Sequence, residues 1–475
     1  MTAPSPTSPP EIDSSGRLPL FILFGGAAFW LVLSSVFGLL ASIKFHGPGF
    51  LADSPMLTYG RVYPAWANLL VFGFCIPAGL GVGLWLLARL GRAPLARPWL
   101  IAVGAKLWHI GVFVGLLGIL SGDSPGHTWL ELPRYAAVIL FCAFVFIALW
   151  AFATHRARAD RDLHPSQWFV LAALFWFPWI YSTAILLLEV FPVRGIVQAS
   201  IAWWFAGNLL GVWLPLVGLA ALCYFVPRLT ERPLQSRYLA LFAFWTLILF
   251  GTWTGIPSSA PLPAWMPTLS AAAAWLMLVP LLTVAVMLVQ TISGAKTPCA
   301  GGPLCYVKFG TWSLVLSGVL LAVAALPQVS RVTEFTWFNH AENALRIYGF
   351  FAMTLFGAAY YILPRVTGAE WPFARFVRGH FWCGVVGTLL LFAPLAIGGV
   401  VQGARWLNPE ITPVDVSKAT LMFLRLSTLG DLLLLLGNLL FLVNVFALIA
   451  RHCRAVVRVL YADAVAPLEP SEVKP

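Results

Sequence analysis

The chain has 475 residues, of which 60% are hydrophobic and only 10% are charged, and its mean hydropathy is +0.86. So few polar residues cannot cover a globule of this size, which excludes a water-soluble protein and indicates an integral membrane protein. The net charge of +11 does not indicate a nucleic-acid partner, because the basic residues are spread over many short segments and form no single patch.

Apolar runs long enough to cross a bilayer as helices follow one another along the chain. We count twelve of them, near residues 19–43, 65–89, 99–121, 135–154, 168–191, 198–226, 239–256, 267–291, 309–326, 341–364, 381–402 and 420–450. The pattern predicts an all-α integral membrane protein with twelve transmembrane helices and membrane lipid as its surroundings.

Polar segments lie at the two ends of the chain. Residues 1–17 are rich in Pro and Ser and have no apolar periodicity, so we expect a disordered tail and no cleavable signal. Residues 459–475 predict a second tail. Between them, residues 18–458 form one helical membrane domain without a soluble domain.

The basic residues predict the orientation of this domain. If both termini are cytoplasmic, 19 of the 29 Lys and Arg residues fall on the cytoplasmic side and seven on the opposite side. This asymmetry is the one that membrane proteins show between cytoplasmic and external loops. We therefore expect both termini to be cytoplasmic.

Several common cofactor motifs are missing from the sequence. The seven cysteines include no CxxC and no CxxCH, so neither a zinc knuckle nor a covalently bound c-type haem is encoded. Cys299 and Cys305 share a loop on the predicted cytoplasmic side, where we expect them to remain reduced. No GxxxxGK[ST] occurs, and no GxGxxG follows a strand, which argues against a nucleotide partner.

Four stretches of the chain carry a family resemblance: MLTYGRVYPAWANLLVFGF, the run from Trp203 to Trp265 with YFVPRLTERPLQS and PLPAW, TEFTWFNHAENALRIYGFFAMTLFGAAYYILPRV, and HFWCGVVGTLLLFAPLAIGGVVQGARW. The chain resembles subunit I of cbb3-type cytochrome c oxidases, a branch of the haem-copper oxidase superfamily. The resemblance covers most of the chain. It implies the twelve-helix plan of that subunit and a place in the bacterial inner membrane.

The resemblance also implies a set of ligands that this chain lacks. The family holds a low-spin haem b by two histidines, a high-spin haem b by one, and a copper ion by three, beside a cross-linked tyrosine. The haem positions are here Trp66, Asn339 and Ala341; the copper positions are Gly207, Pro257 and Ser258; and the tyrosine position is Gly251. We therefore predict neither haem b nor copper, because none of these side chains replaces a neutral imidazole.

One histidine lies next to these positions. His340 stands between Asn339 and Ala341, but one step along an α-helix turns a side chain by about 100°, so we expect it to point away from both haem positions. Trp66 is large enough to occupy part of the space that a haem leaves. Gly207 and Gly251 are not, so neighbouring groups must fill the space beside them.

Charged and polar residues inside the apolar runs are costly and suggest function. Glu342 and Arg346 are spaced for a helical ion pair, and Lys106 and His109 lie one turn apart as a buried pair or as the wall of a crevice. Together with Arg425 and Asp431 they predict an intramembrane polar network, either in place of haem contacts or as the remnant of a proton path. Glu189 is a further charge within a span.

Three functions remain open at this point. The first is a non-catalytic subunit that docks a membrane-anchored c-type cytochrome subunit in a respiratory complex. The second is a redox-active oxidase or nitric oxide reductase relative with displaced ligands such as His340. The third is a channel or transporter that uses the emptied haem cavity, with Lys106, Glu342 and Arg346 along it.

Overall fold

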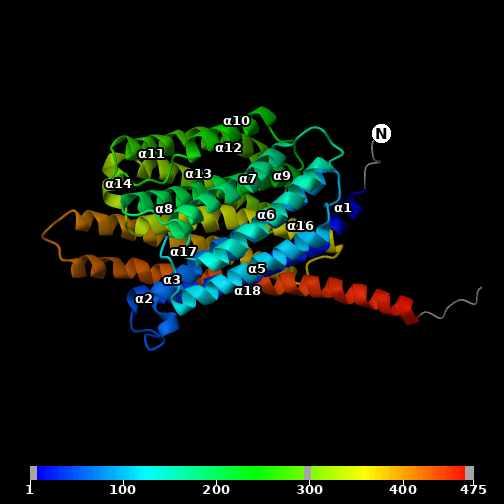
Figure 1. The fold of residues 1–475 in the computed structure, drawn as a ribbon, viewed down its shortest axis with the longest axis horizontal. Helices are drawn as coiled ribbons and strands as arrows, with labels where there is room; N and C mark the ends of the chain where they lie inside the picture. Colours follow the sequence, from blue (N-terminus) through cyan, green and yellow to red (C-terminus); the bar gives the residue numbers. More distant parts are fainter. Residues whose placement is uncertain (1–7, 294–300, 466–475) are drawn as a thin grey trace, which may run out of the picture.

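The structure is a computed structural model that describes residues 8–293 and 301–465. It is a bundle of long, roughly parallel helices, and the first described helix and the end of the last one lie at the same end, called here the end of the termini (Figure 1). The described part contains no named strand, only one isolated bridge between His127 and Leu130. The predicted all-α membrane fold is therefore confirmed.

Eleven of the predicted crossings form helices that are long and apolar enough to span a membrane. They are Arg17–His46 (α2), Tyr59–Gly91 (α3, η2, α4), Pro98–Ser121 (α5), Arg134–Arg156 (α6), Pro165–Val190 (α7, η3), Ile196–Thr230 (α8, η4, α9), Trp265–Ser293 (α11, α12), Pro303–Ala324 (α13), Trp337–Thr367 (α15, η5, α16), Ala374–Trp406 (α17) and Pro413–Tyr461 in α18. The predicted run 239–256 forms α10, Arg237–Gly251, whose 15 residues reach about 22 Å, less than the bilayer core.

Short elements complete the chain. Pro9–Ser15 (α1), Pro55–Leu57 (η1) and Pro327–Thr333 (α14) lie outside the long helices. The expected disorder of residues 1–17 is wrong for α1, because Asp13 is buried and accepts a hydrogen bond from Trp85 Nε1 at 2.9 Å. The predicted tail from residue 459 is also too long, since α18 continues as a helix to Val465.

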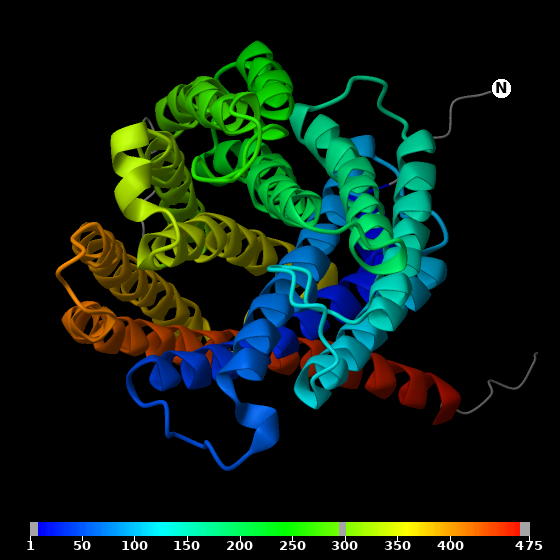
Figure 2. The same cartoon turned by 60° about the vertical axis from the view of Figure 1, so that its left-hand side comes forward.

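Three of the spans lie inside the bundle. The hydrophobic windows of Tyr59–Gly91, Ile196–Thr230 and Trp337–Thr367 are 100%, 94% and 94% buried, whereas the windows of the remaining spans are 33% to 61% buried. The other helices are arranged around these three (Figure 2). The inner spans therefore hold the positions that any buried site must use.

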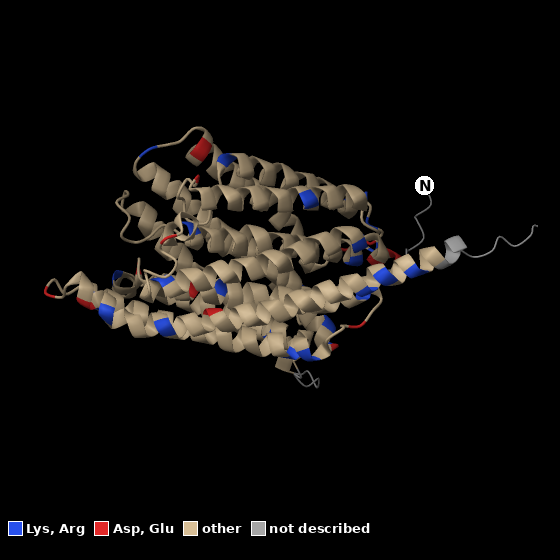
Figure 3. Cartoon of the chain, turned by 90° about the horizontal axis from the view of Figure 1, so that it is seen from below, with Lys and Arg blue, Asp and Glu red and all other residues tan. Residues whose placement is uncertain are grey.

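Lysine and arginine residues lie at both ends of the bundle in Figure 3, so the predicted orientation stays a prediction. Cys305 at the start of α13 is disulfide-bonded. The expectation of a reduced thiol, which rested on the compartment alone, is wrong for Cys305, and Cys299 lies outside the described residues.

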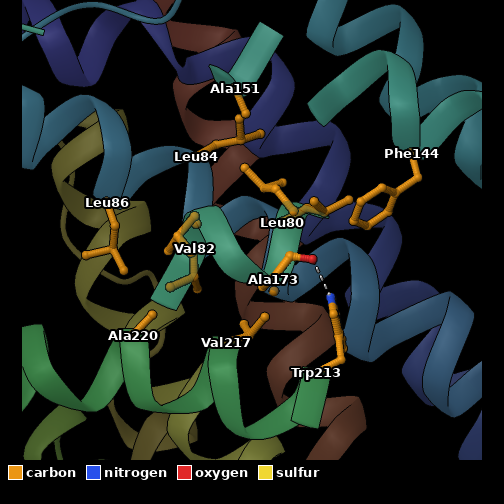
Figure 4. A pocket seen from close by; sticks show the side chains of 14 residues that line it. Leu80, Val82, Leu84, Leu86, Phe144, Ala151, Ala173, Trp213, Val217 and Ala220 are labelled. Atoms are coloured by element: carbon orange, nitrogen blue, oxygen red, sulfur yellow. Dashed lines mark hydrogen bonds between the residues drawn. The ribbon is translucent and has the colours of Figure 1, made fainter. Parts of the chain in front are cut away.

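The core between α4, α6, α7 and α9 is closely packed. It encloses an apolar cavity of about 20 Å³, beside Leu80, Phe144 and Trp213 (Figure 4). Trp213 Nε1 donates a hydrogen bond to the carbonyl oxygen of Ala173 at 3.1 Å. A space of this size holds about one water molecule, so this part of the core offers no ligand site.

Candidate functional site

Each inner span changes from α-helix to π-helix just after a position that the resemblance singles out. The π segment Leu69–Cys75 (η2) follows Trp66, Leu209–Trp213 (η4) follows Gly207, and Leu345–Ala352 (η5) follows Ala341. Short π segments inside α-helices are frequent at functional sites. The inner helices therefore have the irregular backbone that is frequent at functional sites. The side chains of Trp66, Gly207 and Ala341, however, cannot replace an imidazole as a ligand.

Around Trp66 the space is filled by aromatic rings. The His340 ring lies 6.0 Å from Trp66 in a stacked arrangement, 5.4 Å from Tyr63, 5.4 Å from Trp337 and 6.5 Å from Phe45, measured between ring centroids. These separations lie within the range of rings in direct contact. The five side chains, named here the ring cluster, therefore occupy this place themselves.

Helix α2, which lies beside the ring cluster, leaves space for the Trp66 ring. A Cβ atom on Gly38 of α2 would lie 2.6 Å from Trp66 Cδ1, so only glycine lets the indole pack this close. One turn earlier, the Ser34 hydroxyl donates a hydrogen bond to the Trp66 carbonyl oxygen at 2.9 Å. That Trp66 replaces haem volume stays a prediction, which this packing supports.

His340 belongs to the ring cluster. Its ring faces Trp66, at the position where the resemblance places a ligand of the low-spin haem, and its Nε2 atom is buried without a hydrogen-bond partner among the described residues. His340 lies with Asn339 and Ala341 in the α-helical segment Trp337–Ala344, before the π-helix begins at Leu345, so its direction relative to these two residues is that of a regular α-helix. Ala341 beside it is completely buried.

A second place stays open. A cavity of about 530 Å³ lies between α8, the loop after α10, α11, α13 and α15, and both polar and apolar residues line it. Among its lining residues are four vacated positions and the predicted ion pair: Gly207, Pro257, Ser258, Asn339, Glu342 and Arg346. We call it the outer cavity, because it lies at the end of the bundle opposite the termini.

Backbone takes the place of a ligand at Gly207. A Cβ atom here would lie 2.4 Å from the Thr254 carbonyl oxygen and 3.0 Å from the Cα atom of Gly255, whose φ is +112°. The loop after α10 thus fills the space beside Gly207, as a glycine at this position requires. Gly251 packs against Val212 and is not part of the cavity wall.

The serines after α10 bind a carboxylate. The Ser258 backbone N–H donates a hydrogen bond to Glu334 Oε1 at 2.7 Å, and the Ser259 N–H and hydroxyl donate to Glu334 Oε2 at 3.2 and 2.7 Å. The Ser258 hydroxyl donates to Ser330 Oγ at 3.0 Å. Ser258, which stands where the resemblance places a copper ligand, and its neighbour Ser259 therefore hold the loop against α14 and the residue that follows it.

Glu342 and Arg346 form the predicted ion pair on one face of α15 and η5. Their side chains are in direct hydrogen-bonding contact and are 12% and 15% exposed. Partial burial weakens solvent screening, so such a pair interacts more strongly than one on an open surface. The pair supplies a fixed dipole to the wall of the outer cavity.

The predicted network does not extend to the other charged residues. Lys106 is exposed on α5, away from the pair, while His109 bridges two helices, accepting from Trp30 Nε1 at 3.1 Å and lying 3.0 Å from the Ile22 carbonyl oxygen. The prediction of a single network is wrong because neighbours in sequence face different surroundings. His109 is a structural hydrogen-bonding residue.

The charged residues of α18 and η3 are also separate. Arg425 is exposed, whereas Asp431 faces inward against the Ser42 hydroxyl, since six residues along a helix place them on different faces. Glu189 in η3 has a buried oxygen atom without a hydrogen-bond partner among the described residues. None of these three joins the outer cavity.

Sequence reasoning missed the loop 122–133. His127 and Trp129 from this loop line the outer cavity, and the Trp129 ring lies 6.4 Å from Trp66, so the loop links the cavity to the ring cluster. Glu131 in the same loop is buried and accepts a hydrogen bond from Asn68 Nδ2 at 2.6 Å. The sequence signal that could have revealed this loop is the position of Glu131 among the apolar residues Trp129, Leu130 and Leu132.

Burial changes the acid–base properties of this loop. It raises the pKa of Glu131 to about 7, although the Asn68 amide acts in the opposite direction by favouring the carboxylate. Burial lowers the pKa of His127. His127 is therefore largely neutral at pH 7, and it is the one imidazole among the described residues that line the outer cavity.

The donors in the described residues do not match the groups that the resemblance implies. No group of three or more His, Cys, Asp or Glu side chains within 8–293 and 301–465 could hold a metal ion. A site with one imidazole cannot supply three copper ligands, and an indole or a methyl group offers no lone pair to iron. The residues present therefore do not fit a haem-copper centre.

The fold and the place of these positions define the class of protein. The structure is similar to a solved haem-copper terminal oxidase dimer, with a TM-score of 0.72 at 16% sequence identity, covering 91% of this chain and 84% of the other. This likeness shows the fold: a helical bundle of the haem-copper oxidase type.

Sequence comparisons place the chain more narrowly. The family described as Cytochrome C and Quinol oxidase polypeptide I matches residues 20–433, so the chain belongs to this family. The chain is 24% identical to the cytochrome c oxidase subunit 1 homolog of Azorhizobium caulinodans, over 95% of this chain and 86% of that protein. It is 24% identical to the Cbb3-type cytochrome c oxidase subunit CcoN1 of Stutzerimonas stutzeri, over 79% and 82%.

Proposed function

We propose that this chain is a non-catalytic subunit of a respiratory or electron-transfer complex, a scaffold that keeps the oxidase fold without holding haem b or copper. The observation that carries the proposal is the ring cluster. Trp66 and His340 stack on each other, so the rings themselves fill the place where the resemblance puts a low-spin haem. The described residues that line the outer cavity provide a single imidazole, His127, which supports the absence of the high-spin haem b and the copper ion as well.

The proposal includes an orientation and a partner. The chain lies in a bacterial cytoplasmic membrane with both termini inside, and it docks a membrane-anchored c-type cytochrome subunit. The end of the bundle that α1 and the end of α18 share (Figure 1), together with the excess of Lys and Arg in the sequence segments assigned to that side, supports this orientation. Purification of the tagged chain from its native membrane, followed by haem staining of its partners, tests the docking. A c-type subunit in stoichiometric amount is the expected result.

A reduced-minus-oxidised spectrum of the purified chain tests the loss of cofactors. We expect neither haem b bands nor stoichiometric copper, and the CcoN1 chain of Stutzerimonas stutzeri, produced in the same host, serves as the positive control. Bound haem would contradict the proposal and favour the redox-active alternative. Spectra of His340→Ala and His127→Ala would then show which imidazole is the ligand.

The outer cavity favours a second candidate function. About 530 Å³ of space remains beside the pair of Glu342 and Arg346, which suits the binding or passage of a small polar solute. In this function the chain works alone, without a cytochrome. Solute flux into proteoliposomes that contain only this chain would support it, and Arg346→Gln should then abolish the flux.

A further inference from the structure

A separate cavity lies at the end of the bundle that carries the termini. It measures about 750 Å³ and is enclosed by the ends of α4 and α9, the start of α7, and α16. Arg228 and Arg232 follow each other around the end of α9, and Arg365 reaches in from α16. This basic pocket shares no residue with the ring cluster or the outer cavity.

One tyrosine orients two of these arginines. Tyr361 is 7% exposed, and its hydroxyl accepts a hydrogen bond from Arg228 Nε at 3.1 Å. The guanidinium carbon of Arg365 lies 3.5 Å from the centre of the same ring, and Arg365 Nη1 donates to the Tyr361 carbonyl oxygen at 3.2 Å. A guanidinium on an aromatic face is a stabilised arrangement. The two cations are therefore fixed near each other before any ligand binds.

The charges in the pocket do not cancel. Three arginines face one carboxylate, Glu231, which no described residue pairs in a salt bridge. His164 completes one wall, and burial together with the nearby Arg237 lowers its pKa to about 4, so its ring is neutral at pH 7. The pocket thus carries a net positive charge of about two.

The general excess of arginine on one side of a membrane protein does not explain this arrangement. That excess requires only that basic residues lie near the ends of spans. It does not require two of them to be held by the same buried tyrosine around a concave space. Neighbouring cations repel each other, so their alignment indicates an anion that offsets the repulsion.

We infer that the basic pocket binds a phosphate-bearing anion. Arginine and phosphate form short, charge-assisted and often bidentate hydrogen bonds. Basic pockets between transmembrane helices on the cytoplasmic side bind the head groups of anionic lipids. The same chemistry fits a soluble phosphate compound, and the experiment separates the two sources.

The test uses the full chain, purified in detergent and stripped of lipid. Thermal stability is followed while cardiolipin, phosphatidylglycerol or phosphatidylcholine is added in mixed micelles, or inorganic phosphate or pyrophosphate in solution. We expect a saturable rise in melting temperature with an anionic ligand and none with phosphatidylcholine. A response to the anionic lipids alone assigns the pocket to a head group, and a response to the free phosphates assigns it to a soluble anion.

Variants connect the response to the pocket. The double variant Arg228→Gln, Arg365→Gln should weaken the apparent affinity at least tenfold. The control Arg454→Gln, Arg458→Gln removes the same charge from the part of α18 that extends beyond the bundle (Figure 1) and should bind normally. If the double variant does not fold, Tyr361→Phe removes only the orienting hydroxyl and should still weaken binding. Absence of a saturable response, or equal loss in the control, would overturn the inference.

Discussion

The ring cluster and the outer cavity lie where the resemblance places neighbouring parts of one site, but they differ in packing. At the ring cluster, Trp66 and His340 bring aromatic rings into the space, and α2 makes room for them through Gly38. At the outer cavity, Gly207 brings only a backbone contact, and about 530 Å³ stays open. Positions without the family's imidazoles therefore have two different surroundings within one bundle.

The surroundings explain the difference. An empty apolar space inside a bundle is costly, about 24 cal/mol per Å³, so a place among inner helices favours large side chains. A space lined by polar groups can hold water instead, because water satisfies those groups. Glu342, Arg346, Asn339 and Asn343 provide such a lining in the outer cavity. Polar lining and access to the surface thus permit the cavity to persist.

The largest effect is expected from Trp66→Ala. This change removes the central ring of the ring cluster and leaves a void among the remaining rings, at a cost of about 3–5 kcal/mol. Thermal unfolding in detergent measures it, with Trp265→Ala, an exposed tryptophan at 64%, as the control. Equal melting temperatures for the two variants would show that the rings do not stabilise this place.

A smaller effect is expected at the ion pair of the outer cavity. Glu342→Ala leaves the Arg346 charge without its partner in a partly buried position, and we expect a loss of about 2–3 kcal/mol, below the value for fully buried pairs because water reaches the cavity. Glu410→Ala on an exposed turn is the matched control. If both variants melt at the same temperature, the pair contributes nothing to the cavity wall.

The backbone contact at Gly207 should respond less. In Gly207→Ala the new methyl group meets the Thr254 carbonyl oxygen, and the loop after α10 must shift, at a cost of about 1–2 kcal/mol. Gly60→Ala adds the same methyl group to a helix where nothing lies within 4 Å, so it should be neutral or slightly stabilising. A harmless Gly207→Ala would mean that the loop is not packed against α8.

How much the sequence could predict depends on the physical signal. Apolar runs about twenty residues long identify candidate spans directly, so eleven of the predicted runs correspond to helices long and apolar enough to cross a membrane, and the all-α class is confirmed. The crossing predicted at 239–256 stays a prediction, because hydropathy does not report where a helix ends and α10 ends at Gly251. The α1 helix was missed since its burial depends on Asp13 meeting Trp85 far along the chain.

The candidate site was predicted in parts. The spacing of Glu342 and Arg346 is local to one helix, and their pairing was therefore predictable. The link from Lys106 to that pair was not, because hydropathy does not determine which face of α5 is turned outward. The packing of the His340 ring against Trp66 was not predictable, because the two residues belong to different helices, α15 and α3.

The smallest effect on stability is expected at the loop 122–133, which links the ring cluster to the outer cavity. Its Glu131 accepts a hydrogen bond from Asn68 Nδ2. Folding raises the pKa of Glu131 from its ordinary value of 4.5 to about 7 because the carboxyl is buried. Between these values the folded chain holds a proton that the unfolded chain has released. The stability contributed by this group is therefore complete below pH 4.5, falls as the pH rises, and is lost above pH 7.

Over the range from about pH 5.5 to 6.5 the wild type should lose about 1 kcal/mol more stability than Glu131→Gln does, because glutamine keeps the hydrogen bond with Asn68 and does not titrate. Thermal unfolding of the two proteins at several pH values measures this difference. Glu410→Gln, on an exposed turn, should have the same pH dependence as the wild type. Equal pH dependence in the wild type and Glu131→Gln would show that Glu131 is not held as a buried acid, whereas the expected difference means that the loop beside the outer cavity is held more tightly at low pH.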